Sequence, residues 1–216
     1  MTSQEFKTLS KDLQSLIKKV PLLWGKTQNN KTDAQLNFFK LANWNALEAS
    51  IKNLSEENKN YFRRRWFLWQ CARCDEYLFY KNDNVTKNPN KRSQEYDIEF
   101  YKNSNLRFDV KSTVIPKRFR ENINLKNTQQ LIDFYYENQS TGVRYNLQNR
   151  LFIVHHSFKN QEREMYLRCY WELKEKAFKA YSETMSSQKK FIKHKNAIAD
   201  CIFIIEQEDG GFEYRF

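Results

Sequence analysis

The spacing of hydrophobic residues changes near residue 80, from the period of a helix to that of strands. Ser55, an N-cap residue, precedes the acids Glu56 and Glu57, and the aromatic-rich segment that follows predicts a buried helix from Glu56 to about Phe79. Beyond a polar loop, short runs of β-branched and aromatic residues alternate with polar ones, which is typical of strands. A chain with this pattern must pack helices against a sheet.

The predicted elements follow one another in the order helix, strand, strand, strand, helix, strand. After the helix at 56–79 we expect strands at 96–101, 106–113 and 151–155, a long helix at about 160–187 and a buried strand at 201–205; a short helix near 128–136 lies between the second and third strands. Residues 1–54 have helical spacing and form an N-terminal helical extension, and residues 55–216 form the core domain. The predicted fold class is therefore α/β, with a central mixed sheet.

Composition excludes several classes of function. The chain has 216 residues and only four glycines, from which neither GxGxxG nor GxxxxGK[ST] can be assembled, so we expect no nucleotide cofactor. No run approaches the roughly 18 apolar residues of a membrane span. The charged first twenty residues also lack a secretory apolar stretch, so we expect no membrane partner.

The cysteines and histidines form no complete metal-binding or disulfide pattern. The four cysteines are scattered, which predicts free thiols in a reducing, cytoplasmic protein. Cys71 and Cys74 have the first half of a zinc spacing, but no second CxxC or HxxxH follows, and burial of both in a helix is the simpler interpretation. His155 and His156 point to opposite faces of a strand, which disfavours one shared metal. A Cys/His nucleophilic pair stays open, although no spacing supports it.

Three charged residues lie on the two strands that we expect to form a hairpin. Strand side chains alternate, so Asp109 and Lys111 share one face. If residues 103–105 form a three-residue loop, Asp97 lies opposite Lys111 and Glu99 lies opposite Asp109, all on that face. A two-residue turn would instead put Asp97 on the other face.

Two carboxylates that converge beside a lysine are suited to a hard divalent cation. Mg²⁺ prefers oxygen ligands and typically takes one or two carboxylates together with phosphate and water. A metal held in this way polarises a phosphodiester and lowers the pKa of a bound water. The lysine can orient or deprotonate that water, or stabilise the developing oxyanion. The pattern therefore indicates phosphodiester hydrolysis.

These residues also resemble a known motif. Asp97, a gap of eleven residues and then Asp109-Val110-Lys111 are similar to the PD-(D/E)xK motif of restriction-endonuclease-like nucleases. The surrounding order of elements resembles the αβββαβ core of that fold, over roughly residues 56–206. The resemblance implies that Asp97 and Asp109 bind Mg²⁺, with Mn²⁺ as a substitute. It further implies that the carbonyl of Val110 is a metal ligand and that Lys111 assists the attacking water.

Many members of the family add an acid from the preceding helix, which here would be Glu76, with Asp75 as its substitute. The chain departs from the pattern in two places. Tyr96 replaces the proline of the motif, and the QxxxY box of the RecB-like branch is missing, because Gln161 is followed four places on by Met165. An Asp-x-Lys pattern is also typical of a solvated strand face with cross-strand ion pairs.

The positive charge of the chain is concentrated in three clusters, at residues 63–65, 117–120 and 189–195. Lysine and arginine number 37 against 26 acids, a net charge of +11. Such clusters favour salt-dependent binding to nucleic acid, although lysine-rich faces also simply increase solubility. The expected DNA-binding residues are Arg63, Arg64, Lys117, Arg118, Arg120, Lys189, Lys190 and Lys193.

The sequence therefore predicts a Mg²⁺-dependent endonuclease that acts on DNA. A single active site cuts one strand, so cleavage of a duplex requires a homodimer or sequential nicking. One alternative is a catalytically inactive module that keeps the fold and binds nucleic acid without cutting it. Another is a ribonuclease. Dependence on a divalent metal separates the nuclease from the inactive module.

Overall fold

A computed structural model describes residues 1–216 apart from 24–29, 91–94, 122–124, 126–127, 139–147 and 186–189. Its helices are α1 (Ser3–Leu16), α2 (Asn30–Asp33), α3 (Trp44–Ile51), α4 (Glu56–Tyr80), α5 (Gln129–Asn138), α6 (Arg163–Leu167) and α7 (Trp171–Thr184). Its strands are β1 (Val85–Lys87), β2 (Ile98–Phe100), β3 (Arg107–Val114), β4 (Arg150–Ser157), β5 (Ile192–His194), β6 (Ala197–Glu206) and β7 (Phe212–Arg215). Short 3₁₀ turns are η1 (Ile17–Lys19), η2 (Phe38–Lys40), η3 (Ser104–Leu106) and η4 (Lys117–Phe119).

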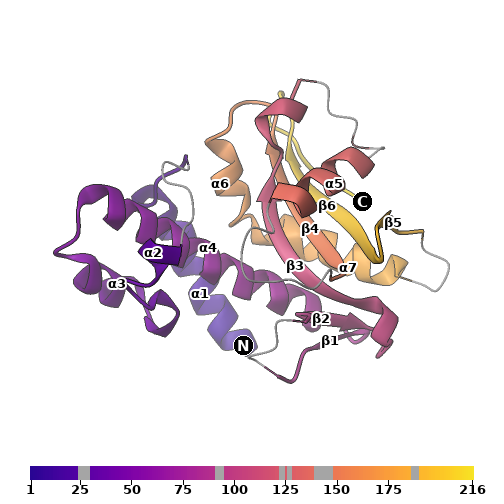
Figure 1. The fold of residues 1–216 in the computed structure, drawn as a ribbon, viewed down its shortest axis with the longest axis horizontal. Helices are drawn as coiled ribbons and strands as arrows, with labels where there is room; N and C mark the ends of the chain where they lie inside the picture. The colour runs from indigo at the N-terminus through magenta and orange to yellow at the C-terminus, as the bar shows by residue number, and fades with distance from the viewer. Residues whose placement is uncertain (24–29, 91–94, 122–124, 126–127, 139–147, 186–189) are drawn as a thin grey trace.

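The strands form one mixed sheet, so the predicted α/β class is confirmed (Figure 1). The strand order is β1-β2-β3-β4-β6-β5, and β7 pairs with the far part of β6. The neighbours β3, β4 and β6 are parallel, and the remaining pairs are antiparallel. Parallel strands require helical crossovers that cover both faces, and the chain supplies them between β3 and β4 and between β4 and β6.

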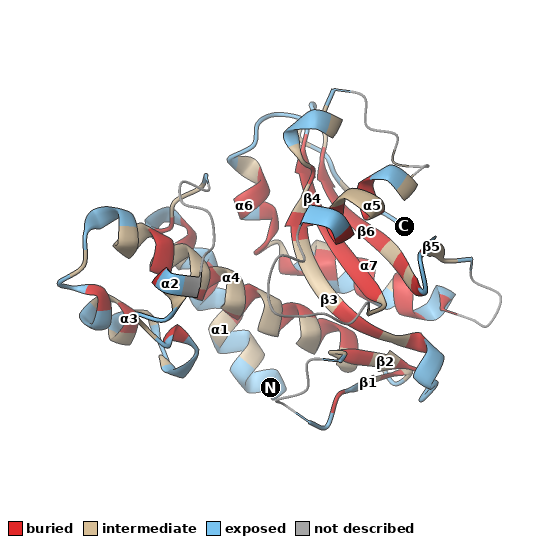
Figure 2. Ribbon diagram, in the orientation of Figure 1, coloured by how far each residue is buried: buried red, intermediate tan, exposed pale blue. Residues whose placement is uncertain are grey.

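Helices cover the two faces of the sheet. Ile153, Ile202 and Ile204 point toward α4 and α7, whereas Phe152 and Phe203 point toward α5 on the opposite face. Figure 2 shows β4 and β6 buried along most of their length, as strands covered on both faces must be, while the middle of β3 is only partly buried. This partly buried stretch of β3 carries Val110, Lys111 and Ser112.

Helix α4 lies between the N-terminal helices and the sheet (Figure 1). It begins where the sequence predicts, because the Ser55 side chain accepts a hydrogen bond from the Asn58 amide and two acids occupy the first turn. Its aromatic residues are buried on several sides, as predicted, and include Phe62, Trp66 and Phe67. Within the described residues, none of the helices has the length and apolar character needed to span a bilayer.

The connection between β2 and β3 differs from the predicted three-residue loop. Tyr101 and Lys102 adopt left-handed backbone conformations, with φ of 53° and 52°, and η3 follows them. The longer connection shifts the pairing, so that Glu99 lies opposite Arg107 instead of Asp109. Continued by two residues, this register puts Asp97 beside Asp109 instead of Lys111. A shift of two residues keeps every side chain on its predicted face.

The long helix predicted over 160–187 is wrong, since α6 and α7 are separate helices. The chain leaves helical geometry at Tyr170, where ψ is 72°. Two buried side chains accompany this break: the Lys174 ammonium donates to the Arg168 carbonyl oxygen (3.0 Å), and the Trp171 indole donates to the Ser10 carbonyl oxygen (3.1 Å). The sequence also missed the short strands β1 and β5, which lie at the two ends of the strand order.

Candidate active site

Asp97 is fixed to the edge of β3 by its main chain and by its side chain. It directly precedes β2, and its amide donates to the Phe108 carbonyl oxygen (2.9 Å). Its carboxylate oxygen Oδ2 accepts a hydrogen bond from the Val110 amide (2.8 Å). These two bonds are made by the residues on either side of Asp109. The two acids that the sequence predicts as metal ligands therefore come together beside β3, at the point where β2 begins.

Asp109 is buried and lies between two cations. Its Oδ1 is 2.7 Å from the Lys111 ammonium, and its Oδ2 is 3.7 Å from Nε of Arg150. The Asp109 side chain is only 3% exposed, whereas that of Lys111 is 36% exposed. The lysine therefore joins a buried carboxylate to the solvent-facing side of the site.

The carbonyl of Val110 points toward the same edge. The Asp109 amide donates to the Asn149 carbonyl oxygen just before β4, so the backbone groups of Asp109 face β4. In a strand, the backbone groups of the next residue face the other way. The amide of Val110 accordingly meets Asp97, and its carbonyl points to the side on which Asp97 lies.

The two neighbouring acids of α4 have different surroundings. Glu76 accepts from the Lys87 ammonium (2.7 Å), and its negative charge helps to raise the pKa of Asp97. Asp75 is buried and forms an ion pair with the buried Lys174 of α7. The structure therefore places Glu76 near the predicted pair and Asp75 in a separate buried contact.

Burial, together with neighbouring acids, changes the protonation of Asp97. Burial raises its pKa to about 7, with further contributions from the charges of Asp109 and Glu76. The Lys111 charge and the hydrogen bond from Val110 act in the opposite direction but do not cancel this effect. Negative charge is thus unfavourable at this edge until a cation compensates it.

The donors present fit a magnesium ion. Two carboxylates and a backbone carbonyl are hard oxygen donors, and Mg²⁺ needs only one or two carboxylates because water and phosphate complete its shell. The raised pKa of Asp97 marks a place where a divalent cation would be stabilising. Across the described ranges, no cluster of three or more His, Cys, Asp or Glu side chains is arranged for a metal, so Glu76 is not a direct member of such a group here.

The predicted DNA-binding cations differ in their exposure and in the acidic side chains that bind them. Arg63 is bound by Glu48 and Glu56, both at 2.8 Å, and Arg120 is bound by Glu164. Lys117 and Arg118 are exposed on η4, where the Arg118 guanidinium lies over the Phe134 ring.

The third basic cluster lies away from the candidate site. Lys190 and Lys193 are exposed, and Lys193 belongs to β5, three strands across the sheet from β3. That separation is about 14 Å at the usual spacing of neighbouring strands. Lys189 lies outside the described residues.

Sequence reasoning missed Arg150 and Lys87. Arg150 is the first residue of β4 and pairs directly with Asp109, and its guanidinium lies 4.8 Å from the centre of the Tyr136 ring. Neither residue belongs to a motif, and their places depend on pairing between distant segments. An arginine at the start of a buried hydrophobic run was the available signal for Arg150.

The cysteines of α4 are buried, as the simpler interpretation predicts. All four cysteines are free thiols, and the Cys71 and Cys169 sulfur atoms lie 3.9 Å apart. Burial raises the pKa of the Cys201 thiol, and its position within β6 shields it. These thiols therefore have the environment of core residues.

Comparisons with known proteins add no identification. No protein-family model, no curated protein and no solved structure matches the chain.

Proposed function

We propose that the protein is a Mg²⁺-dependent endonuclease that hydrolyses DNA phosphodiester bonds. One observation carries the proposal: the Asp97 carboxylate is bonded to the Val110 amide, beside Asp109 and its partner Lys111. Residues separated by a loop thus bring together two acids, a backbone carbonyl and a lysine. This is the combination that the PD-(D/E)xK motif requires.

Each residue has a role that follows from its surroundings. Asp97 and Asp109 would hold the metal, with the Val110 carbonyl as a third donor. Mg²⁺ in this position would stabilise charge on the phosphate and supply an acidified water. Lys111, with its ammonium on Asp109 and its chain partly exposed, is placed to orient the attacking water or stabilise the oxyanion. Glu76 adds negative charge behind Asp97.

The succession of elements supports a restriction-endonuclease-like core. From α4 onward the chain forms α4, β1, β2, β3, α5 and β4, which is an αβββαβ order. Its members differ from the predicted ones, because it includes β1, which the sequence missed, and has α5 and β4 in place of the helix predicted over 160–187 and the strand predicted at 201–205. The candidate residues lie on β3 and on the segment leading into β2, within this unit. The net charge of +11 and the exposed cations of η4 favour nucleic acid as the substrate. Cutting both strands would still require a homodimer or sequential nicking.

The proposal is tested by cleavage of supercoiled plasmid DNA with Mg²⁺, with Mn²⁺ or with EDTA. We expect metal-dependent nicking or linearisation by the native chain and a loss of at least about 100-fold in Asp109→Asn and Lys111→Met. Lys102→Met, on the exposed β2–β3 connection, is the matched control and should cut normally. Equal cleavage by the native chain and both site variants would contradict the proposal.

A second candidate, an inactive nucleic-acid-binding module, has one observation in its favour. Lys111 and Lys87 already neutralise Asp109 and Glu76, so these acids are satisfied without a metal. Such a module would bind DNA equally well in EDTA and would cut nothing. RNA offered in parallel with DNA tests the ribonuclease alternative, which preferential cleavage of RNA would favour.

A further inference from the structure

An exposed aromatic ring lies beside α4 and is held in place by two other rings. Phe39 of η2 is 55% exposed, the largest exposed fraction among the large hydrophobic side chains that the structure describes. Its ring centre lies 4.2 Å from that of the buried Phe38 and 5.4 Å from that of Trp69 in α4. The ring is thus fixed before any ligand binds, which lowers the entropic cost of binding to it.

Two cations flank this ring. Lys40, the next residue, is exposed. Arg73 lies one turn after Trp69 in α4, with its guanidinium carbon 5.2 Å from the centre of the Trp69 ring, and its Nη1 donates to the side-chain oxygen of Gln70 (2.7 Å). That bond uses only one of the five N–H donors of a guanidinium. Across the described ranges, neither Lys40 nor Arg73 forms an ion pair, so both charges are available to a ligand.

One acid, Glu5 of α1, lies within electrostatic reach of Arg73. The backbone hydrogen bond from Thr2 is the main cause that lowers the pKa of Glu5, and the charge of Arg73 contributes less. Glu5 is exposed and accepts from the Thr2 amide (2.6 Å), so its attraction to Arg73 is screened by solvent and does not fix the guanidinium.

Contacts connect this face of α4 with the candidate active site. Arg73 is three residues before Glu76, and side chains at this spacing are neighbours on a helix. Glu76 accepts from the Lys87 ammonium (2.7 Å), and Lys87 pairs across the β1–β2 ladder with Ile98, the residue that follows Asp97. A strand held at the candidate site therefore has this face of α4 within reach.

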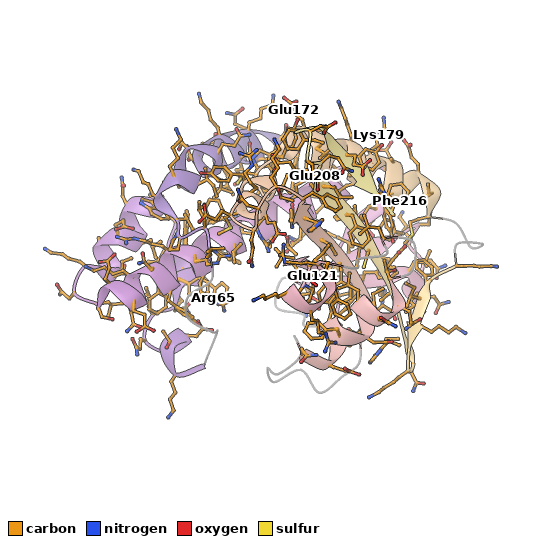
Figure 3. The ribbon with its side chains drawn as sticks, turned by 90° about the horizontal axis from the view of Figure 1, so that it is seen from above. Arg65, Glu121, Glu172, Lys179, Glu208 and Phe216 are labelled. Atoms are coloured by element: carbon orange, nitrogen blue, oxygen red, sulfur yellow. The ribbon has the colours of Figure 1, made fainter. Side chains whose placement is uncertain are left out.

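The direction of this face agrees with such a path. Arg65 lies one turn before Trp69 on the same face of α4. In the view of Figure 3, Arg65 projects from α4 toward the side of the molecule that carries Glu121, which follows η4. The face is therefore turned toward the part of the chain that carries the exposed cations Lys117 and Arg118.

We propose that the surface formed by Phe39, Lys40 and Arg73 binds unpaired nucleotides, with a base stacked on Phe39 and backbone phosphates on the two cations. An aromatic face accepts any base, and cations beside it attract phosphate, which is the combination that proteins use to bind single strands. A base inside a duplex is covered on both faces by its neighbours, so the ligand of this surface has a single-stranded segment. That this segment belongs to the strand cut at Asp97 and Asp109 rests on the proposed nuclease function.

The test is binding of a fluorescent DNA oligonucleotide, single-stranded or duplex, measured by fluorescence anisotropy in EDTA so that no cleavage takes place. Phe39→Ala should weaken single-strand binding at least about fivefold, the loss that corresponds to one stacked base, and leave duplex binding within about twofold of the native value. Phe39→Trp keeps an aromatic face and should bind the single strand normally. Arg73→Gln should reduce the slope of log K against log[salt] for the single strand by about 0.7, the effect of one lost phosphate contact.

Strand β7 supplies the matched controls. Phe212 is 41% exposed, and the Arg215 side chain is 48% exposed and bound by Glu213. Phe212→Ala and Arg215→Gln should therefore bind both DNAs as the native chain does. Thermal unfolding of each variant verifies folding. The surface would be overturned by a native chain that does not bind the single strand, by unchanged single-strand affinity in Phe39→Ala, or by an equal loss on the duplex or in Phe212→Ala.

This assay and the plasmid assay give independent answers, because binding is measured without catalysis. Metal-dependent cleavage by a chain in which Phe39→Ala has no effect on single-strand binding would overturn only the surface. The expected loss in Phe39→Ala, in a chain that cuts nothing, would support the surface as part of an inactive binding module and contradict the nuclease.

Discussion

At the scale of single residues, the candidate site depends on Asp97, whose negative charge is unfavourable in the folded protein. Asp97 keeps its position through the hydrogen bond from Val110, while burial and the neighbouring acids raise its pKa to about 7. The ordinary value is 3.8. The folded protein therefore binds the Asp97 proton more tightly than the unfolded chain does between about pH 4 and pH 7.

Removal of the Asp97 charge should stabilise the metal-free protein at alkaline pH. The stability associated with this proton is fully present below about pH 4, declines as the pH rises and is lost above about pH 7. Asp97→Asn keeps an acceptor for Val110 and should raise the free energy of unfolding at pH 8 by on the order of 2 kcal/mol, with no gain at pH 4. Urea unfolding in EDTA at both pH values measures this. A gain of the same size at both would show that the charge of Asp97 is not responsible.

The sequence predicts the shared face of Asp109 and Lys111 because side-chain alternation in a strand needs only local information. The prediction that Asp97 lies opposite Lys111 was wrong, because Tyr101 and Lys102 adopt left-handed conformations that are rare for residues other than glycine. The sequence marks Arg150 only as an arginine at the start of a buried hydrophobic run. Its place beside Asp109 could not be predicted, since it follows from parallel pairing of β3 with β4 across a long connection. Local periodicity therefore identifies the acids and the lysine but not the residues that surround them.

At the scale of elements, α4 carries two neighbouring acids whose side chains point to different places. Asp75 turns into the core, where burial raises its pKa and the Lys174 charge partly compensates. Glu76, one residue on, points to the edge where β1 supplies Lys87. The buried Lys174 also donates to the Arg168 carbonyl oxygen at the break between α6 and α7, a contact that helical periodicity cannot reveal.

The different surroundings of Asp75 and Glu76 predict that substitution of Asp75 affects mainly stability, whereas substitution of Glu76 affects mainly cleavage. Asp75→Ala leaves Lys174 buried without its carboxylate and should lower the free energy of unfolding by about 3–5 kcal/mol. Glu76→Ala removes a partly exposed pair and should cost less than about 1 kcal/mol, while reducing metal-dependent cleavage. Chemical denaturation and the plasmid assay measure the two properties. A severe loss of stability in Glu76→Ala with little effect in Asp75→Ala would contradict this prediction.

At the scale of the whole molecule, the N-terminal helices share a core with the sheet domain. Leu13 of α1 is fully buried in the same cluster as α4, α7 and the α4 side of the sheet. The Gln14 side chain also donates to the Cys169 carbonyl oxygen (3.2 Å). A helical extension is readily predicted from sequence spacing, but its attachment is not, because these contacts join residues more than 150 positions apart.

A shared core predicts that damage in α1 destabilises the entire protein. Leu13→Ala should lower the free energy of unfolding by about 2–5 kcal/mol, with one cooperative transition. Tryptophan fluorescence reports mainly on the helices, and circular dichroism reports on helices and sheet together, so the two transitions should coincide. Separate transitions, with only the first shifted by Leu13→Ala, would indicate an extension that unfolds independently.

The most direct test of the account is calorimetric titration of the protein with Mn²⁺ at pH 8, comparing the native chain with Asp109→Asn. This measurement needs no knowledge of the DNA sequence or structure that the protein recognises. The account predicts saturable Mn²⁺ binding by the native chain and a loss of at least about tenfold in affinity in the variant, since the second carboxylate is missing. Equal Mn²⁺ binding by the two proteins, or none by the native chain, would contradict a metal site at Asp97 and Asp109.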